Sequence, residues 1–262
     1  MATTQGHKSS EYVLYYNQYS VCSLMILHTL AWKGSARKPE DEIVFQTKEV
    51  DIYNEEQLSE DFLCNINDHG QVPVVQDAGK SEAPIVDSLV ITNWLAEKYP
   101  DLIPKEHEAE IQQFLIDLHA LNYFSLSFPG RPQVAQQFEA NVQRRLDDSN
   151  ISDRYRKALE FKMGVIKRDK SGGVVPAAVA ENERRAKALL SALADKLPNN
   201  ESWLYGSKAT ALDAHLVCFL ARLIDVGRGH LIPSQLREYA DWVMEKPEWD
   251  NIMRGRRTMM AH

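Results

Sequence analysis

One stretch, residues 68–94, constrains the fold more than any other part of this sequence. It contains two short apolar runs, VPVV and APIV, joined by a turn near Gly79 and followed by apolar residues at helical spacing after Ser88. Short apolar runs separated by a glycine-containing turn predict two strands with a tight connection. A serine before helically spaced apolar residues is a typical helix start. The stretch therefore predicts strand, turn, strand and helix in immediate succession.

Pro73 stands at the front of the first of these strands. Proline cannot donate a ladder hydrogen bond, so it is confined to strand starts and edges, and it is often cis where it is kept. The main chain of Val72 could then pair with a bound peptide, while amides at Ser88 could receive a carboxylate. The alternative is an ordinary hairpin with an edge proline and a capped helix.

The preceding residues predict a compact α/β unit. Residues 11–16 are rich in strand formers, residues 21–33 form a helical pattern that stops at Gly34, and residues 43–50 read as a second strand. A further helix is expected over 55–64. This order, completed by the 68–94 stretch, is thioredoxin-like, with a parallel crossover between the first two strands.

The combination resembles the glutathione-binding domain of the glutathione transferase superfamily. The resemblance implies that Val72 pairs with the cysteinyl backbone of glutathione and that Pro73 is cis. It also implies that Asp87 and Ser88 hold the γ-glutamyl end.

The first loop is similar to that of the zeta class, which carries Ser-Ser-Cys-Ser, whereas this chain reads Ser20, Val21, Cys22, Ser23. Asp87 stands where that class tends to carry Gln. The resemblance makes Ser20 the catalytic residue, which activates the thiol of glutathione. A hydroxyl donor at a helix N-terminus stabilises a thiolate through a hydrogen bond and the helix dipole.

Each of these residues has an alternative. Ser20 could serve only as a helix cap. Tyr15 occupies the strand that carries the activating phenol in tyrosine-type transferases, Cys22 reads as a lining or core residue, and His69 reads as a solvated loop residue near the expected glycyl carboxylate. A dithiol oxidoreductase is disfavoured, because serines occupy the positions of a CxxC pair.

Composition narrows the class of protein and its surroundings. The net charge of −7 argues against a nucleic-acid or anionic-membrane surface. The 3 cysteines lie far apart, which indicates a reducing compartment and speaks against a disulfide framework or a structural zinc site. The polar first residues contain no apolar signal core, so we expect a cytoplasmic protein.

After residue 99 the pattern becomes helical. We expect a glutathione-binding domain over 10–99, a proline-containing linker over 100–106 and an all-α domain over 107–262. The prediction includes one helix over 108–128, a helix around 152–167 followed by a mobile loop, and a loose basic tail. Thr210 and Asp213 have the spacing of a capping box at the start of a buried helix. Residues 147–176 read as an insertion with a surface helix that could border the second substrate.

The expected function is a homodimeric glutathione transferase that attacks a hydrophobic electrophile with the thiolate of glutathione. A glutathione-dependent cis-trans isomerase of a maleyl-like unsaturated acid is an alternative, for which Arg131, Arg144 and Arg145 are candidate cationic partners. A non-catalytic glutathione-binding module is a second alternative.

Overall fold

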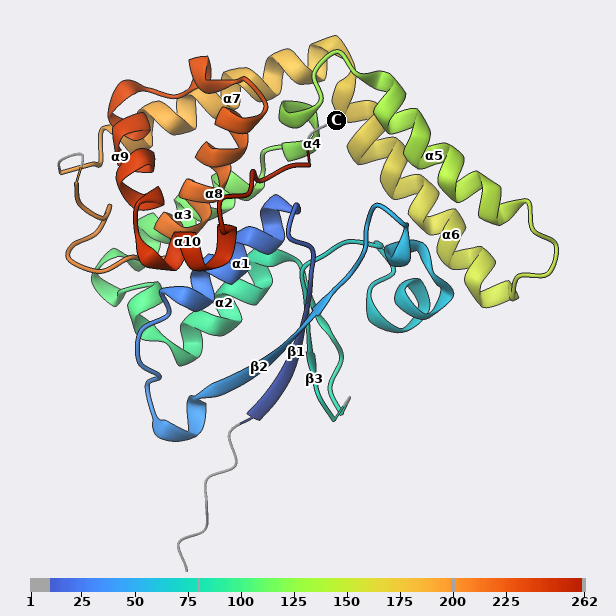
Figure 1. The fold of residues 1–262 in the computed structure, drawn as a ribbon, viewed down its shortest axis with the longest axis horizontal. Helices are drawn as coiled ribbons and strands as arrows, with labels where there is room; N and C mark the ends of the chain where they lie inside the picture. The colour runs from blue at the N-terminus through green and yellow to red at the C-terminus, as the bar shows by residue number, and fades with distance from the viewer. Residues whose placement is uncertain (1–9, 80, 199–200, 261–262) are drawn as a thin grey trace, which may run out of the picture.

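The computed structural model describes residues 10–79, 81–198 and 201–260. Its sheet has four strands, in the order β2-β1-β3-β4 (Figure 1). β1 (Ser10–Tyr16) runs parallel to β2 (Ile43–Glu49) and antiparallel to β3 (Val74–Asp77), which pairs antiparallel with β4 (Ile85–Val86). The expected thioredoxin-like arrangement is therefore present.

Two helices connect this sheet to the helical half of the chain. They are α1 (Val21–Ala31) and α2 (Ser88–Lys98), and α1 packs closely against α8 (Ala211–Asp225). The largest hydrophobic cluster includes Leu14 of β1, Met25 of α1, Ile91 of α2 and Phe219 of α8. The sheet unit and the helical half thus share one apolar core.

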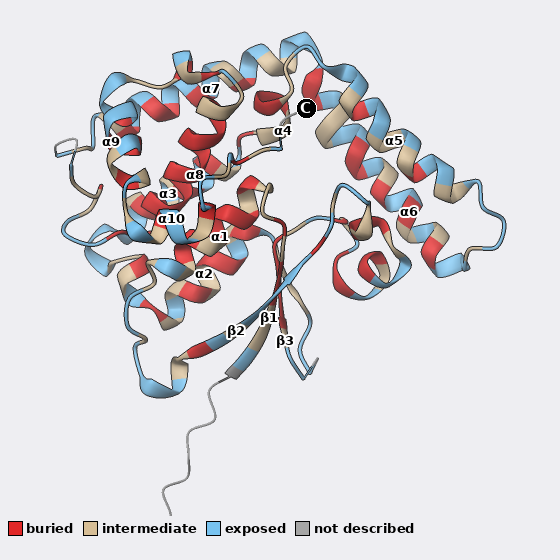
Figure 2. Cartoon of the chain, in the orientation of Figure 1, coloured by how far each residue is buried: buried red, intermediate tan, exposed pale blue. Residues whose placement is uncertain are grey.

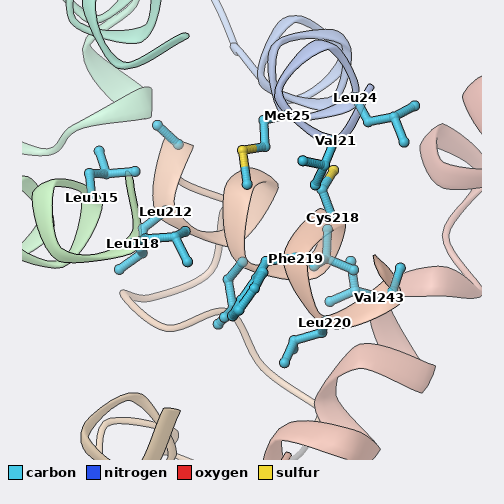
Figure 3. Packing of buried hydrophobic residues seen from close by; sticks show 14 of the residues in the cluster. Val21, Leu24, Met25, Leu115, Leu118, Leu212, Cys218, Phe219, Leu220 and Val243 are labelled. Carbon is cyan, nitrogen blue, oxygen red and sulfur yellow. The ribbon is translucent and has the colours of Figure 1, made fainter. Parts of the chain in front are cut away.

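The helical half is built around one buried helix. The further helices are α3 (Glu108–His119), α4 (Tyr123–Ser127), α5 (Pro132–Leu146), α6 (Asp153–Ile166), α7 (Pro176–Ala194), α8 (Ala211–Asp225), α9 (Ser234–Met244) and α10 (Pro247–Met253). All residues of α8 from 211 to 223 are buried, as Figure 2 shows by colour. Figure 3 shows Cys218 of α8 next to Val21 of α1, whereas Phe219 points to the opposite side of α8.

The expected capping box starts this buried helix. The Thr210 hydroxyl accepts from the Asp213 amide, and the Asp213 carboxylate accepts from the Thr210 amide at 2.8 Å. Asp213 also accepts from the Leu204 amide and the Tyr239 hydroxyl. The cap therefore satisfies backbone groups that α8 would otherwise leave unpaired in the core.

Three local expectations were wrong. The helix expected over 108–128 is broken, because Asn122 starts a new helix by accepting from the Ser125 amide at 3.0 Å. Residues 55–64 form no α-helix but a 3-10 turn, Glu56–Leu58, and a π turn that begins at Phe62. The loop expected after residue 167 is wound into helical turns, and Gly173 and Val174 are buried.

The basic tail is also attached, contrary to expectation. Thr258 is buried, and both its amide and its hydroxyl donate to Asp225, at 2.6 and 2.8 Å. In the part of the chain that the structure describes, we find no helix with the length and apolarity needed to cross a bilayer.

Candidate functional site

Ser20 lies where β1 passes into α1. It is the N-cap of that helix, and its hydroxyl oxygen accepts from the Ser23 amide at 3.3 Å. The same hydroxyl donates to the Val72 carbonyl at 3.4 Å. The hydroxyl therefore sits at the positive end of a helix and beside the predicted peptide-binding edge.

The Val72–Pro73 peptide bond is cis, as expected. Val72 precedes β3, and among the described residues it forms no backbone–backbone hydrogen bond. Asn67 stabilises the turn that precedes Val72. The Asn67 side-chain amide donates to the Gln71 carbonyl at 2.9 Å, and the Asn67 side-chain oxygen accepts from the His69 amide. The Val72 main chain thus remains available to a peptide ligand.

Asp87 and Ser88 begin α2 but face different surroundings. Asp87 is exposed, has a φ of 76°, and accepts from the amides of Leu89 and Val90 at 2.8 and 3.2 Å. Two amides at this helix end are therefore already paired with the chain's own carboxylate. Ser88 is buried, and its hydroxyl lies 3.5 Å from His119 Nδ1. The side chain of Ser88 thus faces the interior.

A buried histidine pair continues inward from Ser88. His119 Nε2 lies 2.8 Å from His215 Nδ1, and His215 Nε2 lies 3.0 Å from the Thr92 hydroxyl. Burial lowers the pKa of His119 to about 4 and the pKa of His215 well below its usual value. Both imidazoles are therefore neutral near pH 7. This network joins α2 to α3 and α8.

The other candidate nucleophiles and activators have protein partners. The Tyr15 hydroxyl donates to Gln76 across the sheet at 3.3 Å, and burial raises its pKa. Burial also raises the pKa of Cys22 to about 11 against the opposing effect of the nearby Ser88 hydroxyl, so this side chain is a thiol near pH 7. Both side chains therefore stay protonated near pH 7, and neither supplies a negative charge at the site.

Arg222, at the end of α8, holds the loop before Ser20 in place. Its Nη2 donates to the carbonyls of Tyr19 and Thr258, each at 2.7 Å, and its Nη1 donates to Ser127 at 3.3 Å. The guanidinium is buried, so these bonds compensate for its lost hydration. The Arg222 side chain thus connects the loop before Ser20 to the C-terminal tail.

A cavity of about 290 Å³ lies next to Ser127 and the tail. Its lining combines Met259 and Met260 with two arginines, Arg131 and Arg257. Arg257 donates to Asp225, whereas Arg131 is exposed and has no side-chain partner among the described residues. Because Ser127 and Asp225 also line it, this cavity could hold a molecule that combines an acidic group with an apolar part.

Not all candidate cations reach this cavity. Arg144 and Arg145 both pair with Glu55, and neither lines the cavity. Of the three arginines considered as partners for an acidic substrate, only Arg131 lines the cavity.

Sequence reasoning missed Arg222, Lys162 and the histidine pair. Lys162 shares the buried face of α6 with Leu159 and Val165, a spacing that helical periodicity could have revealed. Arg222 similarly interrupts an apolar helix. Their partners lie far away in the chain and leave no local signal.

Known structures share this architecture, although no family model and no curated protein matches the sequence. The β-etherase LigF from Sphingobium sp. strain SYK-6 has a TM-score of 0.67 at 19% identity, over 93% of this chain and 98% of that one. Ure2p in complex with glutathione gives 0.59 at 18%, over 93% and 98%. A bacterial zeta-class maleylpyruvate isomerase gives 0.55 at 18%, over 92% and 95%. The chain therefore has the glutathione transferase fold.

Proposed function

We propose that this protein is a glutathione transferase in which Ser20 stabilises the thiolate of bound glutathione. The observation that carries the proposal is the 3.4 Å approach of the Ser20 hydroxyl to the Val72 carbonyl. A peptide paired with Val72 would carry its cysteinyl sulfur close to that hydroxyl. Similar folds solved with glutathione, such as Ure2p, support the choice of ligand.

The chemistry follows from the location of Ser20. A cysteine thiol has a pKa of about 8.5, so most of it is protonated near neutral pH. When the Val72 carbonyl pairs with a peptide, the Ser20 hydroxyl can donate to the sulfur instead. That hydrogen bond and the N-terminus of α1 both favour the thiolate, which then attacks an electrophile.

The γ-glutamyl end would lie at the start of α2. Asp87 is exposed there and can pair with the γ-glutamyl ammonium, while Ser88 contributes through its main chain, because its hydroxyl faces His119. The electrophile would occupy the cavity beside Ser127.

Two further parts of the proposal are a cytoplasmic location and a homodimer. The dimer is supported by exposed apolar side chains on neighbouring helices, Val90 on α2 and Ile116 on α3. Sedimentation of the purified protein tests it.

The test of thiol activation is the thiolate absorbance of bound glutathione as a function of pH. In the wild type the midpoint should lie at least about one pH unit below that of free glutathione, and it should return toward the free value in Ser20→Ala. Tyr15→Phe is the matched control, because it removes a hydroxyl that is bonded to Gln76, and it should leave the midpoint unchanged. Bound glutathione with an unshifted thiol would instead indicate a non-catalytic binding module.

A second candidate function is a glutathione-dependent cis-trans isomerase of an unsaturated acid. It is favoured by Arg131, which lines the cavity without a side-chain partner among the described residues. Product mass separates the two reactions: conjugation adds glutathione to the product, whereas isomerisation leaves the substrate mass unchanged. Arg131→Met should then raise KM for an acidic substrate about tenfold, and Arg144→Met, which removes a cation paired with Glu55, should not.

A further inference from the structure

Lys162 is a buried cation on α6. The residue is only 3% exposed, and among the described residues it has no ion-pair partner. Its ammonium instead donates to two consecutive main-chain carbonyls, those of His69 and Gly70, the latter at 3.1 Å. A buried cation is costly unless it is hydrogen-bonded, so this contact is a defined feature of the fold.

The turn is shaped to receive this side chain. Gly70 has a φ of +55°, and a Cβ at that position would lie 3.0 Å from the Gln57 carbonyl oxygen and 3.2 Å from Lys162 Cε. A side chain at this position would require these neighbours to shift, so glycine favours the close approach of the lysine. The Lys162 stem and the turn therefore fit closely.

The two carbonyls immediately precede the predicted glutathione-binding edge. Gln71 follows Gly70, and Val72, whose carbonyl contacts Ser20, follows Gln71. Asn67 holds the Gln71 carbonyl at 2.9 Å from within the turn. Lys162 holds the same turn from α6, which packs along the segment between β2 and β3 in Figure 1.

We propose that Lys162 is a positioning residue for glutathione: it holds residues 69–72 from α6 and thereby fixes the Val72 main chain in the geometry that the peptide requires. This inference rests on the proposed function for its ligand. It gives the α5–α6 pair a role in the glutathione site, whereas the sequence suggested only a surface helix or a border of the second-substrate pocket.

The environment of Lys162 makes its hydrogen bonds to the two carbonyls sensitive to pH. Burial lowers the pKa of Lys162 to about 7, the neighbouring Lys170 charge adds to this effect, and Asp169 opposes it. A neutral amine is a weaker donor than an ammonium, so the hydrogen bonds from Lys162 to the turn weaken as the pH rises through 7. The other titratable groups on the elements packed against Lys162 are Asp68 and His69 in the turn, Cys64 in the π turn, Lys167 and Arg168 in the helical turn after α6, and Glu139, Arg144 and Arg145 on α5.

The test uses S-methylglutathione, whose sulfur carries no proton, so thiol titration does not enter. At pH 6 Lys162→Met should bind it about tenfold more weakly than the wild type, the loss expected for a charged hydrogen bond. Wild-type affinity should fall severalfold between pH 6 and 8, and this pH dependence should disappear in Lys162→Met. The matched control is Tyr155→Phe, which removes another α6 hydrogen bond to a main-chain carbonyl, that of Leu58. It should retain both the affinity and the pH profile of the wild type.

Hydrogen exchange provides a measurement that needs no ligand. Amides of residues 67–76 should exchange faster in Lys162→Met than in the wild type or Tyr155→Phe. Unchanged exchange there would overturn the proposal even if Lys162→Met lowers overall stability, and faster exchange with unchanged affinity would overturn the link to glutathione. Failure of the wild type to bind S-methylglutathione would overturn the proposed function and the positioning role together, whereas binding that is equal in wild type and variant would overturn only the latter.

Discussion

The Ser20 hydroxyl donates to the Val72 carbonyl oxygen across 3.4 Å. These residues are 52 positions apart in the chain. One begins a helix and the other precedes a strand, so their contact depends on the packing of α1 against the sheet. It brings a helix-end hydroxyl to a main-chain edge that forms no backbone–backbone hydrogen bond among the described residues, and this combination makes thiol activation by Ser20 physically reasonable.

Substitutions of Asp87 separate its structural role from its predicted ligand contact. Asp87→Asn keeps an oxygen that can cap α2 and tolerates a positive φ, so the melting temperature should change little. It removes the charge, so glutathione affinity should fall about tenfold if the carboxylate meets the γ-glutamyl ammonium. Asp87→Ala should lose affinity and also about 1 kcal/mol of stability. Calorimetric binding and thermal melting measure both quantities; wild-type affinity in Asp87→Asn would rule out the ligand contact.

Arg222→Met should weaken both the fold and the site. The substitution leaves the Tyr19 and Thr258 carbonyls without their donor, at a cost of about 2–4 kcal/mol in unfolding free energy. Turnover should fall as well, because Tyr19 immediately precedes Ser20. Urea unfolding and kcat measure the two effects. The control is Arg237→Met, which removes an exposed arginine paired with Asp241 and should cost less than about 1 kcal/mol. Equal effects of the two substitutions would contradict this role of Arg222.

Stability should fall as the pH drops below about 6.5. Burial lowers the pKa of His28 to about 3, and among the described residues neither of its ring nitrogens has a hydrogen-bond partner. The unfolded chain therefore binds a proton below pH 6.5 that the folded chain does not, so this histidine should cost about 2 kcal/mol at pH 5 relative to pH 7.

The measurement is urea unfolding at both pH values. His28→Leu should reduce the loss between pH 7 and 5, whereas His230→Leu, at an exposed site, should leave it unchanged. Part of the stability loss between pH 7 and 5 should remain in either variant, because His119 and His215 are also buried with lowered pKa values. A loss in His28→Leu as large as in the wild type would show that His28 does not contribute.

Comparing Gly70→Ala with Gly130→Ala separates the steric cost of a new Cβ from the cost of backbone strain. Both glycines have positive φ, +55° and +67°, but a Cβ at Gly130 would meet nothing within 4 Å. Gly130→Ala should therefore cost only the strain, about 1 kcal/mol, whereas Gly70→Ala should cost about 2–4 kcal/mol, because its Cβ would also press on Gln57 and Lys162. Thermal unfolding compares them. Equal destabilisation would mean that the turn adjusts without displacing Lys162.

The sequence by itself determined the elements whose signals are local. The strands near residues 11–16 and 43–50, the helix start at Ser20 and the capping box of Thr210 with Asp213 depend on residues a few positions apart. Hydrogen bonds of this kind form within one turn of chain, so neighbouring residues encode them. The helix break at Asn122 also had a local signal, an asparagine able to cap a new helix, but the apolar periodicity over residues 108–128 concealed this signal.

Only the tertiary structure decided how these elements form a site. Arg222 contacts Tyr19 across 203 positions and Lys162 contacts Gly70 across 92, and no local pattern specifies either partner. The same holds for the inward orientation of Ser88 toward His119 and for the attachment of the tail through Thr258. A buried cation or hydroxyl must find a partner wherever packing provides one, and that choice belongs to the whole fold.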